Sequence, residues 1–393
     1  MKRRSILVVG AGIAGLASSH WLARDGHRVV AIDRAQRFGP QGHFIALKGT
    51  GVEVLAALGL KPALQAQLAP MFGAEFRTPD GRCIGYQAFE EADAALGGYM
   101  MTRRAALHAV LEQALPQGVE LRLGRTVTRL LQGDDGVLAS FDDATTERFD
   151  AVLGCDGVHS ATRRALFPEA TLRPLGGHYI ASMVEDHRHG LGTERARAYF
   201  GAGSMVNLLP VADDRLGLIV YQDLAHRAPP MGAPIATWRE YLLREYADHD
   251  DAVKGVLGGL AERSDVYADE ILMVPAQRVS SGRIALVGDA GYCPTFFSGM
   301  GAALALQGAY CVARCLAQHD DPVQALARYQ DRILPIARRY QSGAASMREV
   351  ILSRAWGWRL LRTVLLRAVP QPLRNHAARR FYKTEIRMAQ LAA

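Results

Sequence analysis

Cysteine is scarce in this sequence and shows no arrangement for cross-linking or metal binding. The 393 residues contain five cysteines, an odd number, and no two of them form a C-x-x-C pair. This usage argues against a disulfide framework and a zinc site and favours a reduced, cytoplasmic compartment. Cys311 and Cys315 lie one helical turn apart, but no histidine or carboxylate stands in register with them. Core packing is therefore the favoured interpretation of that pair, and we expect no metal.

Long apolar runs are missing as well. No segment reaches the roughly eighteen uninterrupted apolar residues that a membrane-spanning helix needs. The N-terminal stretch MKRRSILVVGAGIAGLASSHW has basic residues followed by an apolar run, as a signal peptide has. Three glycines interrupt the run and no small-residue cleavage site follows it, so we interpret it as a strand that turns into a helix.

Most of the chain also lacks a charge imbalance. The net charge is +7, but nine basic residues and only one acidic residue lie after residue 353, and residues 1–353 carry a net charge of −1. The high isoelectric point therefore reflects a basic tail. The body of the protein gives no electrostatic reason to expect nucleic-acid binding.

Motifs for protein-based catalysis are absent too. The sequence contains no H-E-x-x-H, no G-x-S-x-G, and no cluster of histidine and aspartate ligands, and its twelve histidines are dispersed. The sequence therefore nominates no nucleophile, metal ligand or general base, and the catalytic residues are unknown at this stage.

A nucleotide-binding turn is present near the N-terminus. Gly10, Gly12 and Gly15 form G-x-G-x-x-G between a predicted strand at residues 5–9 and a helix that extends to Gly26, and Asp33 closes the next predicted strand. Glycines at these positions permit a tight turn, close approach of the backbone to a pyrophosphate, and close helix packing. Asp33 would accept hydrogen bonds from a ribose. The motif predicts a dinucleotide site without separating FAD from NAD.

Two later segments add acids after predicted strands. Residues 151–167, AVLGCDGVHSATRRALF, contain Asp156 and Arg163, and a turn with an N-cap is their simplest interpretation. Residues 282–309 contain Gly288 and Asp289 after a predicted buried strand, then Pro294, then Gly299, Met300 and Gly301 at the start of a predicted long helix. Such a helix start directs N–H groups at a group that gathers negative charge. Taken alone, a capped strand–loop–helix explains this segment equally well.

In order and spacing, the three segments resemble the motifs of the single-component, p-hydroxybenzoate hydroxylase-like class A flavin monooxygenases. The resemblance covers residues 1 to about 330. Arg104-Ala-Ala-Leu107-His-Ala-Val-Leu111 also resembles a helix of that family, which implies that Arg104 contacts FAD. The resemblance implies that Asp289 holds the ribityl chain and that Gly299 and Gly301 lie against the isoalloxazine. It gives Asp156 and Arg163 a combined role toward the flavin and NAD(P)H.

Within the family, the sequence is most similar to the tetracycline-inactivating monooxygenases and related natural-product hydroxylases. Residues 45–60, IALKGTGVEVLAALGL, are similar to their segment beside the flavin, and Lys48 and Arg34 complete the expected cofactor-binding set. The usual GDAAHxxxPxxGQG appears here as GDAGYCPTFFSGMG, with Tyr292 for the usual histidine and Met300 for glutamine.

The resemblance implies a definite chemistry and fold. NADPH or NADH would reduce FAD, and a flavin C4a-hydroperoxide would then transfer one oxygen atom from O₂ to an aromatic or polycyclic, polyketide-like or antibiotic-like small molecule. The expected fold class is α/β. A Rossmann-like FAD-binding domain would comprise residues 1–72, 96–170 and 280–330, an inserted antiparallel-sheet substrate domain residues 73–95 and 171–279, and C-terminal helices residues 331–393.

Local patterns predict further elements. An Asp80-Gly81 turn joins two extended arms, residues 119–154 alternate through three or four strands, and helices interrupted at Pro370 and Pro372 fill the C-terminal region. For the substrate pocket we nominate apolar, aromatic and polar residues of the inserted sheet and the flavin loop: Tyr199, Phe200, Met205, Asn207, Tyr221, Phe296 and Phe297.

The last expectations concern the C-terminal tail, the oligomeric state and the alternative functions. Residues 356–370, WGWRLLRTVLLRAVP, would brace the two domains or make a weak contact with a membrane surface, and the protein would be a monomer or homodimer. An epoxidase or reductase of an isoprenoid-like substrate on the same scaffold is the second hypothesis, and a non-catalytic flavin- or ligand-binding protein is the third. A flavin halogenase is disfavoured because W-x-W-x-I-P is absent.

Overall fold

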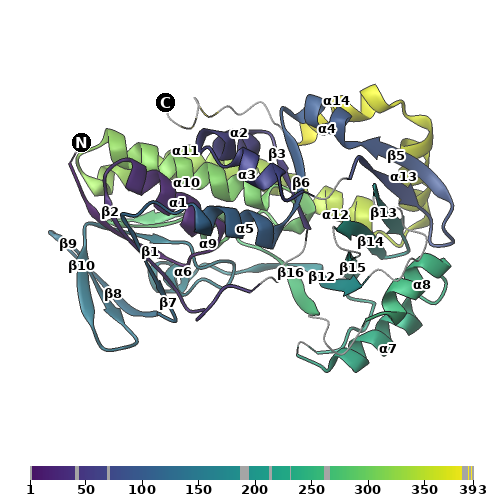
Figure 1. Cartoon of the computed structure of the whole chain (residues 1–393), viewed down its shortest axis with the longest axis horizontal. Helices are drawn as coiled ribbons and strands as arrows, with labels where there is room; N and C mark the ends of the chain where they lie inside the picture. The colour runs from purple at the N-terminus through teal and green to yellow at the C-terminus, as the bar shows by residue number, and fades with distance from the viewer. Residues whose placement is uncertain are drawn as a thin grey trace.

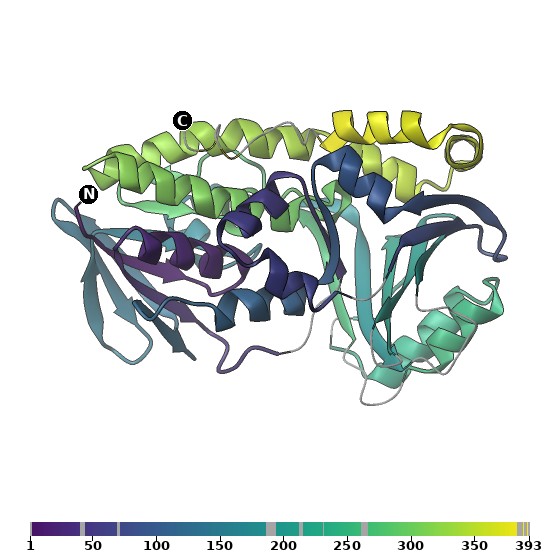
Figure 2. The ribbon, with the colours of Figure 1, turned by 45° about the horizontal axis from the view of Figure 1, so that its top comes forward.

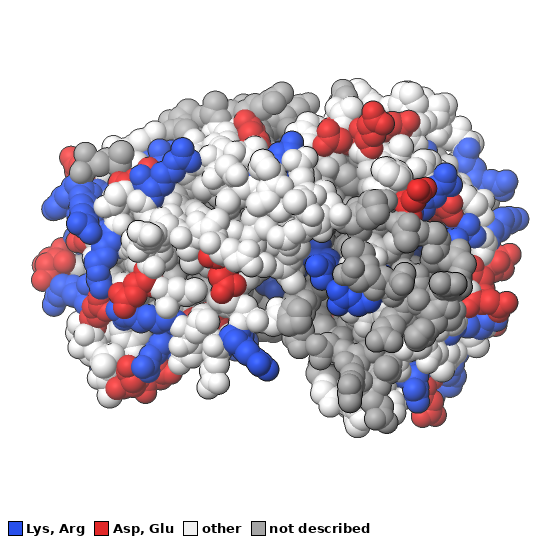
Figure 3. All heavy atoms as spheres, viewed as in Figure 1, with Lys and Arg blue, Asp and Glu red and all other residues white. Residues whose placement is uncertain are grey.

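A computed structural model of the chain describes residues 2–39, 44–68, 71–185, 194–211, 215–230, 232–260, 266–382, 388 and 391. Two lobes lie side by side, one around a parallel sheet and one around a mostly antiparallel sheet (Figure 1). Within the described part of the chain, no helix is both long enough and apolar enough to cross a membrane. Lysine and arginine side chains are interspersed with acids on the face that Figure 3 shows, in keeping with the near-neutral body.

The first lobe contains a six-stranded sheet. Its strands are parallel except for the antiparallel pair β17–β18. The order across the sheet is β17 (Ser280–Ser281), β18 (Ile284–Leu286), β11 (Ala151–Gly154), β1 (Ser5–Val9), β2 (Arg28–Asp33) and β7 (Val119–Leu123).

Short runs of β-branched and aliphatic residues such as SILVV and RVVAID form the central strands, which are buried on both faces, as parallel strands usually are. One face packs against β10 (Thr146–Phe149), β9 (Gly136–Phe141) and β8 (Val127–Gly133), which form a three-stranded sheet.

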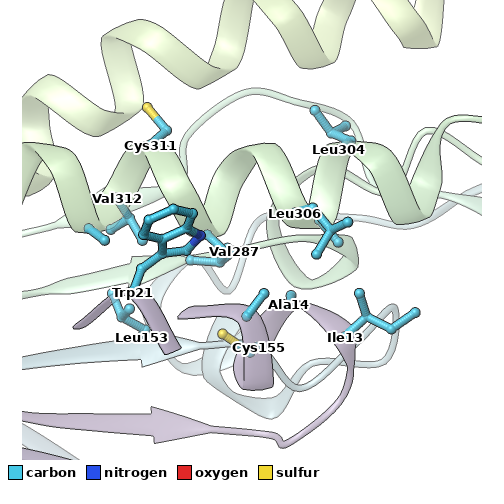
Figure 4. Packing of buried hydrophobic residues seen from close by; sticks show 14 of the residues in the cluster. Ile13, Ala14, Trp21, Leu153, Cys155, Val287, Leu304, Leu306, Cys311 and Val312 are labelled. Carbon is cyan, nitrogen blue, oxygen red and sulfur yellow. The ribbon is translucent and has the colours of Figure 1, made fainter. Parts of the chain in front are cut away.

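Helices cover the other face of the parallel sheet and enclose the largest core. Side chains from α1, α10, β11 and the segment after β18 meet there (Figure 4). The helices of this lobe are α1 (Ile13–Arg24), α2 (Thr50–Ala57), α3 (Lys61–Gln65), α5 (Arg104–Gln113), α6 (Ala161–Leu166), α9 (Asp289–Tyr292), α10 (Gly301–Gln318) and α11 (Pro322–Ser342).

The second lobe contains a seven-stranded sheet that is antiparallel except for the parallel pair β13–β4. Its order is β16 (Tyr267–Met273), β12 (Arg173–Glu185), β15 (Arg215–Asp223), β14 (Ser204–Val211), β13 (Arg195–Phe200), β4 (Gly73–Arg77) and β5 (Cys83–Ala88). One face packs against α7 (Ile235–Glu245) and α8 (Asp251–Gly258). The other face, which we call the inner face, packs against α12 (Ala344–Leu352), the short 3₁₀ turn η1 (Phe296–Ser298), β3 (Phe44–Lys48) and β6 (Tyr99–Arg103).

The C-terminal helices connect the two lobes. From α11 on the first lobe the chain continues into α12, then into α13 (Trp356–Ala368), which packs on β5, and α14 (Gln371–Tyr382), which packs on α4 (Phe89–Leu96) (Figure 2). Arg348 on α12 donates to Leu175 O at 2.6 Å, and Arg354 pairs with Asp223 at 2.7 Å. Side-chain bonds therefore fix these helices to the sheet.

The predicted fold class is confirmed, together with the β1–α1–β2 unit, the β4–β5 hairpin around Asp80-Gly81 and the long helix after Gly299. Three details were wrong. Residues 119–154 form five strands, because the short β10 and β11 are separated by a single residue. Residues 171–275 also include α7 and α8. Pro370 separates α13 from α14 as expected, but Pro372 lies in the first turn of α14, where its missing N–H costs nothing.

Candidate cofactor and substrate site

The glycine-rich turn fits its backbone so closely that two of its three positions exclude any side chain. Gly10 has φ +98°, and a Cβ there would lie 2.6 Å from Cys155 O. A Cβ on Gly15 would lie 1.8 Å from Gly10 O. At Gly12, by contrast, a Cβ would meet no atom within 4 Å. Two glycines are thus needed by the fold itself, whereas the third faces open space, as a glycine that admits a ligand must.

Helix α1 begins at this open position without a capping side chain. Gly12 is its N-cap, and its first turn carries no acidic residue. The first N–H groups of a helix lack internal acceptors and carry partial positive charge, so this end suits an anion. Asp33 accepts from Ala11 N and Ala35 N, both at 2.9 Å, and thereby holds the turn against the end of β2. The neighbouring Arg34 is exposed.

The three predicted motifs meet in space although they lie far apart in the sequence. The first and second touch where Gly10 approaches Cys155. The first and third touch where a Cβ on Gly288, which has φ +68°, would lie 2.8 Å from Ala14 Cβ. The second and third are joined by Arg163, whose Nη1 donates to Ala290 O at 2.9 Å. The motifs therefore form one structural unit at the carboxyl ends of β1, β11 and β18.

The second motif directs its polar groups inward. Asp156 accepts from Ser160 Oγ at 2.5 Å and from Thr162 N at 3.0 Å, and Ser160 caps α6 by accepting from Arg163 N at 2.8 Å. Arg163 is 3% exposed, and its Nη2 donates to Val158 O at 2.6 Å. Turn and cap, the simpler interpretation, thus describe this segment well, and a contact of Asp156 or Arg163 with flavin or NAD(P)H stays a prediction.

Asp289 combines depth with accessibility. Its side chain is exposed, yet burial among the surrounding atoms raises the pKa of its carboxyl above the usual 3.8. Its carboxylate is therefore accessible to a ligand although neighbouring atoms partly desolvate it, and we call the space beside it the recess. Arg104 lowers that pKa through its charge, which places the guanidinium in the same part of the molecule.

Helix α5 brings Arg104 to this region, and it adds a residue that the sequence did not single out. Arg104 is exposed at the first position of the helix. One turn later, His108 Nε2 donates to Ala11 O at 2.8 Å, next to Gly12. Burial lowers the pKa of His108, which favours the neutral ring in this bond. Its position four residues after Arg104, on the same helix face, was the available signal.

The loop between Asp289 and α10 is tightly bonded to itself. Thr295 has φ +70°, a strained conformation for a β-branched residue, and its Oγ1 accepts from Phe297 N at 3.1 Å. Ser298 Oγ donates to Thr295 O at 2.9 Å and accepts from Met300 N at 3.1 Å. Strain at such a loop persists only where surrounding bonds over-determine it, so the loop has a fixed shape.

Some of the remaining loop residues lie beside this recess and others lie in the core. Gly299 has φ +60°. Gly301 is the first residue of α10 and its Cα faces Asp289, since a Cβ there would lie 4.0 Å from Asp289 Oδ1. Met300, 1% exposed, and Pro294 are buried, and Met300 packs in the first core. The side chain of Met300 therefore does not point into the recess.

Tyr292, which replaces the family's usual histidine, is also part of the core. Its hydroxyl lies 2.8 Å from Tyr329 Oη, and Tyr329 in turn donates to Leu286 O at 2.9 Å. A Cβ on Gly308 would lie 1.9 Å from the Tyr292 hydroxyl. The tyrosine therefore fits because α10 has a glycine opposite it.

The segment around Lys48 lies beside the start of α10. A Cβ on Gly51 would lie 2.7 Å from Ala303 Cβ, so the first turns of α2 and α10 are in close contact. Lys48, at the end of β3, is 6% exposed. The segment that the resemblance puts beside the flavin thus adjoins Gly301.

These observations test the fit of FAD to the chain. The turn leaves open space at Gly12, an uncapped helix end faces that space, and an accessible carboxylate and a guanidinium lie further along, near the start of a second long helix. A dinucleotide needs N–H groups and dipole for its pyrophosphate and polar groups for its sugar or ribityl hydroxyls. The residues present fit that requirement.

Most nominated substrate residues lie on the inner face of the seven-stranded sheet. Met205, Tyr221 and Phe297 belong to one buried cluster there, with Phe200 packed at its edge. Asn207, half-buried on the same face of β14, donates to Ile219 O at 3.3 Å. Tyr199 lies on the opposite face, where its hydroxyl donates to Asp250 at 3.1 Å. The side chain of Phe296 lies outside the described part of the structure.

A short line of polar groups at the end of this face was not foreseen. Tyr179, at the edge of the inner-face cluster, donates to Tyr267, and Tyr267 donates to Asp269 Oδ2 at 2.9 Å. Burial raises the pKa of Tyr179, whereas Tyr267 is exposed. Arg104 acts electrostatically on Tyr267 as well as on Asp289. The line therefore runs from the inner face to solvent close to the proposed ribityl end of the site.

Comparison with known sequences agrees with this geometry. Residues 3–176 match the family of FAD binding domains. A flavin-dependent monooxygenase from an unknown prokaryotic organism is 28% identical over 353 residues, which cover 89% of this chain and 91% of that protein. The 2-heptyl-3-hydroxy-4(1H)-quinolone synthase of Pseudomonas aeruginosa is 26% identical over 386 residues, which cover 96% of this chain and 97% of that protein.

Comparison with solved structures agrees as well. The tetracycline destructase Tet(55) superposes with a TM-score of 0.81 at 26% identity, covering 97% of this chain and 96% of that one. Klebsiella pneumoniae HpxO, crystallised with FAD and uric acid, superposes with a TM-score of 0.86 at 22% identity, covering 97% of both chains. At that identity the second likeness concerns the fold alone.

Proposed function

We propose that this chain, which is similar to class A FAD-dependent monooxygenases, hydroxylates an aromatic or polycyclic small molecule with NADPH or NADH as reductant. The reaction balances as substrate–H, O₂, NAD(P)H and a proton giving substrate–OH, water and NAD(P)⁺. One oxygen atom enters the substrate and the other leaves as water. The two electrons of NAD(P)H account for that second atom.

One observation carries the proposal: three separated motifs join into a single site in which only Gly12 of the turn faces open space. Steric demands of the fold explain Gly10, Gly15 and Gly288, since each lacks room for a Cβ. They do not explain Gly12, the uncapped start of α1, or Asp289, whose carboxylate is accessible although neighbouring atoms desolvate it. Cofactor binding accounts for all three.

The chain's own residues have defined tasks in this proposal. The N–H groups at the start of α1 hold the pyrophosphate, and Asp33 and Asp289 accept hydrogen bonds from ribose and ribityl hydroxyls. Arg34, Lys48 and Arg104 add positive charge along the cofactor, and Gly299 and Gly301 keep the start of α10 free of side chains. Bound FAD supplies the redox chemistry. The protein excludes water and positions the substrate.

The substrate class follows from the inner face. It carries a buried apolar and aromatic cluster with the half-buried, polar Asn207 on the same face, which suits a flat, largely apolar ligand. The names of two similar proteins refer to a quinolone and a tetracycline, both ring systems. We therefore propose Met205, Asn207, Tyr221 and Phe297 as pocket residues, with Phe200 at the rim.

The Tyr179–Tyr267–Asp269 line gives the pocket a path for a proton. A phenolic substrate becomes more electron-rich when its hydroxyl loses a proton, and a hydrogen-bonded line to solvent allows that transfer without opening the pocket to water. Tyr179 Oη would receive the proton as it passes its own to Tyr267 and then to Asp269 or to bulk water.

Purified protein tests the proposal directly. We expect a yellow protein whose flavin spectrum is bleached by NADPH or NADH under anaerobic conditions, faster in the presence of one member of a panel of aromatic and polycyclic compounds. Admission of air should then yield that compound with the added mass of one oxygen atom. A colourless protein that does not take up FAD would contradict the site, and a yellow protein that neither nicotinamide reduces would contradict the reductant.

A further inference from the structure

The C-terminal helix α13 and the start of α14 expose most of the large apolar side chains that the molecule leaves at its surface. Seven of the twelve exposed large apolar residues among those described lie between residues 356 and 373. The other five are single residues scattered over the two lobes. A contiguous apolar patch of this kind marks a contact surface, whereas isolated apolar residues need no explanation. The exposed fractions are 77% for Trp356, 43% for Trp358, 54% for Leu360, 44% for Leu361, 47% for Val364, 44% for Leu365 and 62% for Leu373.

Helix α13 is amphipathic, but its apolar side faces outward. Trp356, Leu360 and Val364 follow one another at intervals of four residues, and Leu361 and Leu365 form the adjacent row on the helix surface. The inward side carries Arg362, which is 6% exposed. We call Trp356, Trp358, Leu360, Leu361, Val364 and Leu365 the α13 face.

The buried arginine fixes this orientation. The guanidinium carbon of Arg362 lies 4.5 Å from the ring centre of Phe200, and its Nη1 donates to Val350 O at 3.0 Å and Ile351 O at 3.2 Å. These carbonyls belong to the last turn of α12, which attracts positive charge. Rotation of α13 to bury the apolar rows would break these contacts with β13 and α12. The α13 face is therefore a stable feature of the fold.

The surroundings of the α13 face are positively charged. The sequence has no acidic residue between Glu349 and Glu385, and it has eight basic residues in that interval. Arg359 and Arg367 are exposed, and neither side chain forms an ion pair with a described residue. Arg367 also lines a cavity of about 510 Å³ between β5 and the start of α14, together with Arg374 and Gln371. Glu91 is the one acid in that lining.

The described end of the chain does not provide a cover. Met388 N donates to Glu53 in the first lobe, and Leu391 is fully buried in the first core. A second copy of the chain would bring Arg359 and Arg367 close to the same arginines across a twofold axis, which is unfavourable because α13 itself carries no acid. Charge complementarity instead calls for an extended anionic surface with an apolar layer beneath it.

We infer that the α13 face docks on the surface of an anionic lipid bilayer. Tryptophan and leucine side chains would enter the interfacial region, and Arg359 and Arg367 would lie against lipid phosphates, with the cavity beside Arg367 able to receive a headgroup. The helix would lie in the plane of the interface, because it is short and basic and no described helix is apolar enough to span. This inference is independent of the substrate proposed above.

Vesicle flotation with the FAD-loaded protein tests the inference. We expect the protein to float with phosphatidylcholine vesicles that contain phosphatidylglycerol, and to partition roughly tenfold less into phosphatidylcholine alone or at high salt. The double variant Leu360→Ser/Leu365→Ser should lose most of the binding. Its matched control is Leu224→Ser/Leu131→Ser, which removes two leucines of similar exposure, 54% and 43%, elsewhere on the surface.

Charge variants separate the electrostatic from the apolar contribution. Arg359→Gln/Arg367→Gln should abolish the preference for anionic vesicles, whereas Arg129→Gln, an exposed arginine of β8, should not change it. The FAD content and melting temperature of every variant show whether it is folded. Failure to float with anionic vesicles would overturn the inference, as would equal flotation of the Leu360/Leu365 variant and its control. A dimer that this variant dissociates, without vesicle binding by the parent protein, would instead identify the α13 face as a contact between copies.

Discussion

The two lobes contribute different kinds of chemical groups to the proposed site. In the first lobe the site consists mainly of backbone: a turn whose glycines touch carbonyl groups, a helix end without a cap, and a second helix that opens with a glycine. In the second lobe the proposed substrate site consists of side chains on one face of a sheet, such as Met205, Asn207 and Tyr221. A site made of backbone groups binds a feature common to many nucleotides, such as a pyrophosphate. A site made of side chains can change its specificity by substitution without a change of fold. The cofactor half is therefore expected to tolerate substitution poorly and the substrate half to tolerate it well.

The largest expected effect distinguishes a glycine that the fold requires, Gly15, from a glycine that faces the proposed cofactor, Gly12. Gly15→Ala puts a Cβ 1.8 Å from Gly10 O and should destabilise the protein by about 3 kcal/mol or more, with loss of soluble flavoprotein. Gly12→Ala meets no atom and should leave the melting temperature of the apoprotein unchanged while FAD affinity falls at least about tenfold.

Thermal unfolding of apoprotein and fluorescence titration with FAD measure the two quantities. Equal destabilisation by both substitutions would contradict the distinction between a structural and a ligand-facing glycine.

The next effect concerns the carboxyl of Asp289. Because burial raises the pKa of Asp289, the folded apoprotein binds a proton at this carboxyl more readily than the unfolded chain does, and the stability due to this group is present below its usual pKa of 3.8 and is lost as pH rises through the higher folded value. Asp289→Asn should remove that pH dependence, leave the apoprotein at least as stable at neutral pH, and weaken FAD binding on the order of tenfold.

Melting curves of apoprotein across pH, set beside FAD titration at neutral pH, test this. An apoprotein that Asp289→Asn destabilises at neutral pH would show that the carboxylate serves the fold.

A smaller effect distinguishes the two faces of the substrate sheet. Asn207→Leu changes the inner face and should alter kcat/KM for the substrate by about tenfold, with the flavin spectrum and melting temperature nearly unchanged. Tyr199→Phe, on the opposite face, removes the hydroxyl that bonds Asp250 and should cost about 1 kcal/mol of stability without changing the order of preference within a substrate panel. Steady-state kinetics and chemical denaturation check the pair, and a reversal of the two phenotypes would mean that the pocket lies on the face of Tyr199.

The smallest effect is at the contact between the C-terminal helices and the sheet. Arg354 bonds Asp223 through two nitrogens, but about half of its side chain is exposed, at 48%. Exposed ion pairs contribute little, so Arg354→Gln should lower stability by about 1 kcal/mol or less. A much larger loss in denaturant unfolding would mean that the brace is essential to the second lobe.

The same contrast explains what the sequence could predict. The residues of the glycine turn, Asp289 and Gly301 carry signals in their order and residue type, because backbone geometry restricts which residues fit. The choice of pocket residues required knowing which way each strand faces. Tyr199 and Phe200 were nominated together, yet neighbours on a strand point to opposite faces, so at least one had to be misplaced.

Other features depended on contacts between distant segments. His108 reaches Ala11 across 97 residues, and Tyr179, Tyr267 and Asp269 are brought together by the pairing of β12 with β16. No local pattern reports such contacts. The helices α7 and α8 were not predicted because the alternating apolar and polar pattern of the neighbouring strands dominates residues 171–275. The domain boundaries and the roles of the cofactor residues remain predictions that the variants above address.

The contact between Tyr292 and Gly308 limits how this sequence can have diverged. The tyrosine hydroxyl occupies the space that any side chain at position 308 would need. With alanine or a larger residue there, the tyrosine would clash; with glycine there, a smaller residue at position 292 would leave a hole but no collision. The two positions are thus coupled in one direction: Tyr292 can be replaced by a smaller residue alone, whereas a side chain at position 308 requires a smaller residue at position 292 as well.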